Sequence, residues 1–230
     1  MSIAAFPDDW SSALVLVAHP DDPEYGVAAA VAKWTAEGRT VVYALATSGE
    51  AGIEGMDPAE AGPLREDEQR ASAAVVGVDA VEFWGFEDSA IGNTPELRAK
   101  IVDTLRRVRP DLVVSMYGGP EWAPGFPNQR DHREFAAAVV DAYDEVQADE
   151  QAPDRPRALF VNGPGSTHAV DVEGFTEIAV RSLAEHDVYL SVLDPDTPVL
   201  EQARAQVART TGPIEGFPAA QTTGLTRLRP

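Results

Sequence analysis

Short apolar runs alternate along the chain with longer segments in which apolar side chains return at helical spacing. The short runs are rich in Val, Leu and Ala, and each ends at polar or glycine-rich sequence, which is the pattern of a buried strand. They predict strands at 13–18, 40–47, 80–86, 111–117, 158–162 and 168–172.

The longer segments favour helices, because their apolar residues recur every three or four positions. Gly38 follows one of them, as glycine commonly follows the end of a helix. Thr94 is a candidate cap for the helix predicted at 95–109, and Pro95 is its first residue. Helices are predicted at 25–37, 65–76, 95–109, 132–147, about 174–191 and near 197–209.

This alternation of strands and helices predicts an α/β fold with a mostly parallel sheet covered by helices on both faces. The 230 residues show no repeat, low-complexity segment or domain boundary, so we expect a single domain over 1–230 with a less regular tail from about 192. Ligands of such sheets bind beyond the carboxyl ends of the strands. Polar residues that directly follow a predicted strand are therefore the first candidates for a site.

The composition narrows the classes of protein that fit. The net charge of −20 argues against affinity for nucleic acid or anionic membranes, since both attract Lys and Arg. The chain has no cysteine, which excludes disulfides, thiolate metal ligands and cysteine nucleophiles. The start MSIAAFPDDW lacks a signal-peptide pattern, and no apolar run approaches the roughly 20 residues that span a bilayer. We expect a cytoplasmic protein that acts on a small molecule, and homo-oligomerisation is compatible with the sequence.

Two predicted strand ends each carry a histidine near aspartate. The sequence AHPDD closes the first predicted strand, which places His19, Asp21 and Asp22 at its carboxyl end. The sequence QRDH, with Asp131 and His132, follows the loop after the fourth predicted strand. Imidazole and carboxylate are ligands of catalytic zinc, which keeps one position open for water. The residues by themselves leave two interpretations: a divalent metal site, or aspartates that cap the following helices.

The sequence AHPDDPEYG resembles the AHPDD motif of the LmbE-like/PIG-L family of zinc-dependent N-acetylglucosaminyl deacetylases. The similarity continues through SGEAG, LREDEQRAS, VVGVDAVEFWGFEDS, RRVRPDLVV, THAVDV and LAEHDVYL, in the order of the family's segments. The resemblance implies a Rossmann-like three-layer α/β/α fold. It also implies a hydrolase that cleaves a linear C–N amide bond and removes acetyl from an N-acetylglucosamine-type amino sugar or glycoconjugate.

The resemblance further implies roles for individual residues. It implies one Zn²⁺ per chain, bound by His19, Asp22 and His132, and Fe²⁺ suits the same nitrogen and oxygen ligands. Asp21 would be the general base that takes a proton from the water of the metal. Asp131 would be the acid that supports the ligand beside it.

Arg65 and Asp88 match positions that contact the sugar in family members. One position departs from the family pattern, because Gln129 stands where the second motif often has a histidine. Gln129 can donate a hydrogen bond to an oxyanion but cannot transfer a proton. Either the metal and another donor hold the oxyanion, or His168 supplies the imidazole and contributes to the substrate site, or catalysis is weakened. We interpret His186, on a predicted amphipathic helix, as structural.

Two other functions remain compatible with the sequence. The first is hydrolysis of another amide, in a thiol-sugar conjugate or in a tailoring step of secondary metabolism. The second is a non-catalytic metal- or sugar-binding protein, to which the replacement at Gln129 points. The presence of Asp21 favours an enzyme, because a binding protein needs no base beside its metal ligands.

Overall fold

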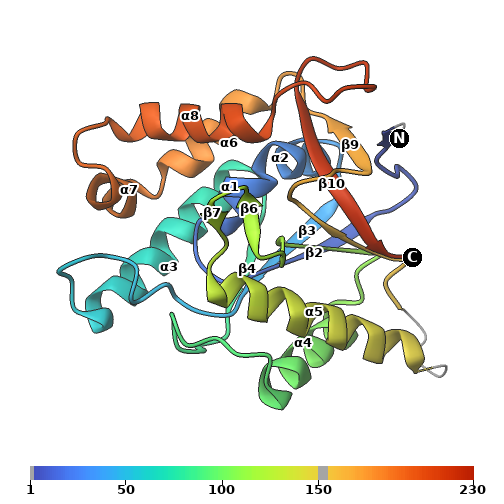
Figure 1. Ribbon diagram of the computed structural model, residues 1–230, viewed down its shortest axis with the longest axis horizontal. Coiled ribbons are helices and arrows are strands. Elements are labelled where there is room, and N and C mark those ends of the chain that lie inside the picture. The colour runs from blue at the N-terminus through green and yellow to red at the C-terminus, as the bar shows by residue number, and fades with distance from the viewer. Residues whose placement is uncertain (1–2, 150–154) are drawn as a thin grey trace.

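A sheet of eight strands runs through the molecule, with helices on both of its faces (Figure 1). The computed structural model describes residues 3–149 and 155–230. The strand order is β1-β9-β10-β8-β5-β2-β3-β4, and β10 is antiparallel to both of its neighbours while the other pairs are parallel. The predicted α/β fold with a mostly parallel sheet is confirmed. The strands are β1 Ala4–Ala5, β2 Ser12–Val17, β3 Thr40–Leu45, β4 Ala80–Phe83, β5 Leu112–Ser115, β8 Ala158–Val161, β9 His168–Asp171 and β10 Thr222–Arg229, with a separate hairpin of β6 Glu121–Ala123 and β7 Phe126–Pro127.

The helices form two layers. Helices α2, α6 and α8 lie over one face of the sheet, and α4 and α5 lie over the other (Figure 1). The helices are α1 Asp22–Gly26, α2 Ala28–Ala36, α3 Pro58–Val75, α4 Pro95–Val108, α5 Arg130–Ala148, α6 Thr176–Ala184, α7 Asp187–Leu193 and α8 Val199–Thr210.

The central strand β2 is buried on both faces because its side chains alternate between them. Val15 and Val17 pack in the core under α2 and α6, and Leu14 and Leu16 pack in the core under α4 and α5. Full burial of a side chain of this size contributes about 1.5–3 kcal/mol. The strand that carries the candidate site is therefore held firmly from both sides.

The strand order reverses between β2 and β5, which are hydrogen-bonded neighbours. The chain moves outward from β2 through β3 to β4 and then returns by way of α4 to β5 on the other side of β2. The loops after β2 and β5 therefore leave the sheet in opposite directions. The space between these two loops corresponds to the crevice in which α/β sheets bind ligands.

Three helices differ from the sequence prediction. The helix expected over 25–37 begins at Asp22 and is divided into α1 and α2 at Val27. Helix α3 begins at Pro58 rather than near 65, because the carboxylate of Asp57 caps it by accepting a hydrogen bond from the amide of Ala59 (2.9 Å). The helix expected over 174–191 is divided into α6 and α7, with the interruption at Glu185 and His186.

The tail after 192 contains more structure than its sequence indicates. The predicted helix near 197–209 is present as α8. Strand β10 was not predicted, because TTGLTRLR is polar and contains glycine. It is held by pairing with β9 on one side and β8 on the other, and by the buried side chain of Leu225.

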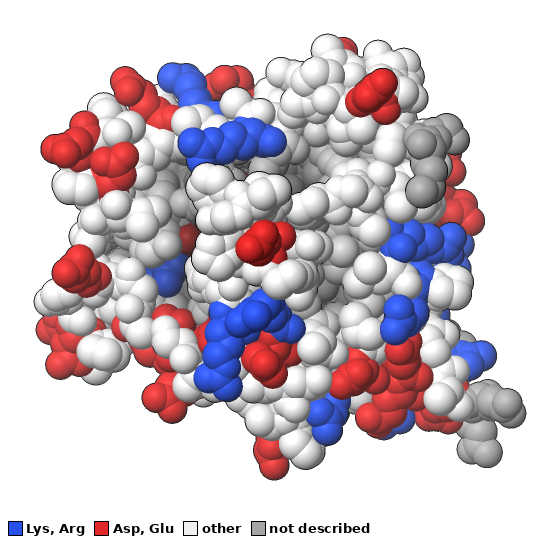
Figure 2. Space-filling model, viewed as in Figure 1, with Lys and Arg blue, Asp and Glu red and all other residues white. Residues whose placement is uncertain are grey.

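The surface reflects the acidic composition. Acidic side chains are spread over the face shown in Figure 2 and are not gathered into one patch. Within residues 3–149 and 155–230, none of the helices has both the length and the apolar character that crossing a bilayer requires.

Candidate metal centre and active site

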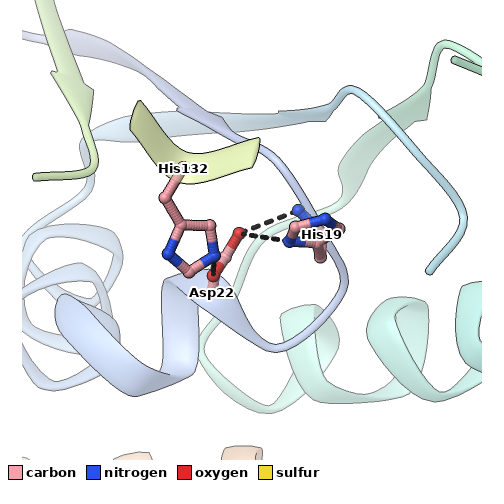
Figure 3. Close-up of side chains that lie close together, drawn as sticks. All are labelled: His19, Asp22 and His132. Atoms are coloured by element: carbon pink, nitrogen blue, oxygen red, sulfur yellow. Dashed lines mark hydrogen bonds and ion pairs between the residues drawn. The ribbon is translucent and has the colours of Figure 1, made fainter. Parts of the chain in front are cut away.

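The turn after β2 and the start of α5 bring two histidines and an aspartate together. Oδ2 of Asp22 accepts hydrogen bonds from the backbone amides of Ala18 (3.1 Å) and His19 (2.8 Å). This folds the carboxylate back toward the strand end and leaves its Oδ1 3.2 Å from Nε2 of His132. Figure 3 shows Asp22 between the two imidazole rings. His19, Asp22 and His132 each offer one ligand atom, and these atoms all lie within 4.8 Å of one another.

Asn128 determines which nitrogen of His132 carries the hydrogen. Nδ2 of Asn128 donates to the carbonyl oxygens of Tyr117 (2.8 Å) and Gly119 (3.0 Å). The Asn128 atom that lies 3.1 Å from Nδ1 of His132 is therefore its oxygen, Oδ1. An amide oxygen only accepts hydrogen bonds, so Nδ1 of His132 is the donor. Neutral His132 then directs the lone pair of Nε2 toward Asp22 Oδ1.

Two acceptors that face each other across 3.2 Å need a positive charge to hold them together. Either a proton on the ring of His132 or a metal ion meets this need. A divalent ion that prefers nitrogen and oxygen ligands binds both atoms and takes His19 as a third ligand. Three protein ligands leave the open position of a catalytic site. The residues present therefore fit a metal ion of the zinc type.

The second ring nitrogen of His19 lies against two buried carboxylates. Nε2 is 3.1 Å from Oδ1 of Asp88 and 3.5 Å from Oδ2 of Asp131. Histidines that bind a metal usually donate their other N–H to such a group, which orients the ring. We therefore interpret Asp88 and Asp131 as residues that direct Nδ1 of His19 toward the metal position. His19, Asp88 and Asp131 also make a second possible ligand set, which places an ion on the other side of the ring.

Negative charge exceeds positive charge in this pocket. Burial lowers the pKa of His19, but the hydrogen bonds to Asp131 and Asp88 oppose it. Together with the charge of Asp22 they raise the pKa of His19 to about 10. Burial raises the pKa of Asp22, and the neighbouring His132 and His19 outweigh this and hold it below its usual range. A proton on the His19 ring thus offsets part of the carboxylate charge, and a bound cation would replace it.

Asp21 has different surroundings from Asp22, although the two are adjacent. Its φ of 84° lies in the left-handed region, which residues with a side chain seldom adopt. Its Oδ2 lies 3.4 Å from Nη2 of Arg65. Burial raises the pKa of Asp21 to about 6, against the lowering effect of Arg65. Asp21 is therefore ionised near neutral pH, with a pKa suited to accepting a proton there.

Arg65 is buried beside Asp21, with 3% of its surface exposed. Its guanidinium donates to the carbonyl oxygens of Pro20 (2.8 Å) and Gly49 (3.0 Å) and lies 4.0 Å from the ring centre of Tyr189. A Cβ atom on Gly49 would come within 2.3 Å of Nη1, so this close approach requires glycine. The sugar contact that the family resemblance implies for Arg65 stays a prediction. Within the protein, its guanidinium contacts the turn that carries Asp21, the Gly49 carbonyl and the ring of Tyr189.

The side chains of two predicted site residues make no hydrogen bond or ion pair with this cluster among the described residues. Gln129 is the exposed residue before α5, and its side chain does not cap the helix. His168 begins β9, with Nδ1 2.8 Å from Oγ1 of Thr167 and its ring against Phe160. Strands β10, β8 and β5 separate β9 from β2. The structure therefore brings Gln129 to the helix that carries His132, and it does not bring His168 to the metal ligands.

The sequence reasoning missed several polar residues that support the pocket. One signal was present: Arg65 and Gln69 are four positions apart on a predicted helix, and this spacing places both on the same face. The others come from separate segments and have no local pattern. The missed residues are Glu24, Gln69, Asn128 and Tyr189.

Comparison with known proteins identifies the family. Residues 14–143 match the family model described as PIG-L, GlcNAc-PI de-N-acetylase. The diacetylchitobiose deacetylase of Thermococcus kodakarensis is 28% identical over 193 residues, which cover 78% of this chain and 70% of that protein. The structure of N,N'-diacetylchitobiose deacetylase from Pyrococcus horikoshii, complexed with its inhibitor MPG, gives a TM-score of 0.79 at 19% identity, covering 96% of this chain and 85% of that one.

The fold also occurs with a different reaction. The 4-carboxy-2-hydroxymuconate hydratase of Pseudomonas putida gives a TM-score of 0.72 at 19% identity, covering 96% of this chain and 97% of that one. The reaction must therefore be argued from the site and not from the fold. The matched segment contains both strand ends with the candidate ligands, His19 and His132. As its AHPDD sequence predicts, this chain belongs to the PIG-L family.

Proposed function

We propose that this protein is a zinc-dependent N-deacetylase that hydrolyses the acetamide of an N-acetylglucosamine-type sugar or glycoconjugate. One observation carries the proposal: Nε2 of His132 and Oδ1 of Asp22 face each other across 3.2 Å, and a ring nitrogen of His19 completes a set of ligand atoms that all lie within 4.8 Å of one another. A separate carboxylate, that of Asp21, adjoins this set. The substrate class follows the diacetylchitobiose deacetylase to which the chain is similar.

Zn²⁺, one per chain, is the ion we propose, and Fe²⁺ suits the same ligands. When bound, such an ion lowers the pKa of water to about 7 and polarises a carbonyl oxygen. Nδ1 of His19, the carboxylate of Asp22 and Nε2 of His132 would hold it. Asp88 and Asp131 keep the His19 ring in the orientation that this requires.

Asp21 moves the proton in the proposed reaction. Water adds to the acetamide carbon, and an oxygen of Asp21 takes the proton that the water loses. The same carboxyl group then gives this proton to the nitrogen as the C–N bond breaks, which releases acetate and a free amine. The guanidinium of Arg65 flanks the carboxylate and favours its ionised form before the reaction.

Gln129 is the residue that we propose to stabilise the developing oxyanion. It precedes α5, where the helix dipole favours negative charge, and its amide donates a hydrogen bond without transferring a proton. Gln129→Ala should lower kcat by roughly 10²–10³, the usual loss for one such donor, and leave the metal content unchanged. A rate near that of the wild type would assign the oxyanion to other groups.

The experiment that tests the function is release of amine from acetylated amino sugars by protein stripped of metal and reloaded with Zn²⁺. We expect equal amounts of acetate and amine from diacetylchitobiose or a related N-acetylglucosaminyl compound, and loss of both after metal removal. Cleavage of a thiol-sugar or secondary-metabolite amide instead would keep the chemistry and change the substrate. If the fully loaded protein releases no amine from any of these amides, it is a binding protein.

A further inference from the structure

A buried chain of hydrogen bonds leads from the backbone of Asp21 into helix α3 and the α6–α7 junction. The amide of Asp21 donates to Oε1 of Gln69 (2.8 Å). Nε2 of Gln69 lies 3.2 Å from both carboxylate oxygens of Glu24. Oε2 of Glu24 lies 3.4 Å from Nε2 of His186. The side chains of Glu24, Gln69 and His186 are all buried.

The chemistry of these groups determines which atom donates and which accepts in each hydrogen bond. The oxygens of an ionised Glu24 only accept hydrogen bonds, so Gln69 must turn its NH₂ group toward them and its oxygen toward Asp21. His186 supplies a further donor to the same carboxylate. Nδ1 of His186 has no hydrogen-bond partner among the described residues. The polar contact of this ring is thus directed at Glu24.

The chain of hydrogen bonds ends at Asp21, whose backbone is in the left-handed region. A residue with a side chain stays in the left-handed region only when its surroundings hold it there. Gln69 binds the amide of Asp21, and Arg65 binds the carbonyl oxygen of Pro20 immediately before it. At this turn the two adjacent carboxylates part: Asp22 folds back on the strand end and Asp21 adjoins Arg65.

We propose that Gln69, directed by Glu24 and His186, is the positioning residue that holds the left-handed turn at Asp21. It thereby keeps the base apart from the metal ligand Asp22. The proposal rests on the proposed function, which makes Asp21 the base. Gln69 acts only through the place of the Asp21 carboxylate, and displacement of a catalytic group by about 1 Å costs about 10²-fold in rate.

The first test is Gln69→Leu, which removes the acceptor for the Asp21 amide and the donor to Glu24. We expect kcat to fall about 10²-fold, KM and zinc stoichiometry to change little, and a crystal structure to show residue 21 outside the left-handed region. The matched control is Ser182→Ala. It removes the buried Ser72–Ser182 hydrogen bond (2.8 Å) between α3 and α6, and should reduce stability with kcat unchanged.

The second test exchanges two side chains. Gln69→Glu alone sets two carboxylates against each other, and we expect it to lose activity. Combined with Glu24→Gln, it again matches each donor with an acceptor. The carboxylate at 69 still accepts from the Asp21 amide, the hydrogen bond between 69 and 24 runs in the opposite direction, and the amide oxygen at 24 accepts from His186. We expect the double variant to recover most of kcat.

Wild-type kcat in Gln69→Leu, or a double variant no more active than Gln69→Glu alone, overturns the proposal. A left-handed residue 21 in the crystal structure of Gln69→Leu does so as well. If the wild-type protein itself releases no amine, the proposed function fails, and this crystal structure still decides whether Gln69 holds the turn.

Discussion

The two adjacent aspartates after β2 belong to two regions of different construction. Asp22 lies in the metal pocket, where carboxylates outnumber the side chains that can balance them. Asp21 lies against the helical support, where Arg65 is its partner and a histidine faces the buried Glu24. The metal pocket consists of His19, Asp22, Asp88, Asp131 and His132, and the helical support consists of Glu24, Arg65, Gln69, His186 and Tyr189.

Two adjacent aspartates thus acquire different properties from their surroundings. Buried charges are tolerated when they are paired. In the metal pocket the carboxylate of Asp22 and Nε2 of His132 face each other, so a proton or a bound cation must lie between them. The helical support needs no added cation, since its charges are paired by its own side chains. Removal of metal should therefore disturb the first region, and substitutions on α3 should disturb the second.

The largest effect is expected at Asp21. Asp21→Asn keeps the shape and loses the basicity, so hydrolysis should fall by about 10²–10⁴ while zinc stays bound. Steady-state kinetics and elemental analysis of the same preparation measure both. The matched control is Asp67→Asn, at an exposed position of α3, which should have little effect. An Asp21→Asn protein with full activity would remove Asp21 from the role of base.

A smaller effect is expected at Arg65. Arg65→Lys keeps the charge but loses the fork that binds the carbonyl oxygens of both Pro20 and Gly49. We expect kcat to fall about 10²-fold through displacement of Asp21, with KM little changed. A rise in KM with kcat preserved would instead make Arg65 a sugar contact, as the family resemblance implies.

The smallest effect is expected at Asn128, which contacts His132 of the metal pocket. Asn128→Ala removes the acceptor that keeps hydrogen on Nδ1 of His132. Loss of such an outer partner typically costs 10–100-fold in metal affinity. Competitive zinc titration of the stripped protein measures the change. Asn93→Ala, which breaks a hydrogen bond to Asp141 on the outer side of α5, should leave the affinity unchanged.

The clustering of His19, Asp22 and His132 was predictable because these three residues obey a local rule. His19 and Asp22 directly follow one strand, His132 follows the next loop along the sheet, and parallel strands bring these ends together. The role of Asp21 as the general base was predicted from the family resemblance alone. Strand β10 was not predictable from hydrophobic periodicity, because its polar sequence forms a strand only through pairing with β8 and β9.

The helical support was not predictable, because its contacts join distant segments. His186 reaches Glu24 across 162 positions, and Gln69 reaches it across 45. The interruption between α6 and α7 that places His186 there lies within a continuous helical pattern. These contacts depend on the packing of α3 against α6. Hydrophobic periodicity predicts helices but does not predict how they pack.

The most direct test of the proposed zinc site is anomalous scattering at the zinc edge from crystals of the zinc-loaded protein. We expect one peak at about 2.0–2.2 Å from Nδ1 of His19, a carboxylate oxygen of Asp22 and Nε2 of His132. A peak on the other side of the ring, bound by Nε2 of His19 with Asp88 and Asp131, would contradict the proposed site. So would the absence of zinc from both positions in protein that is active.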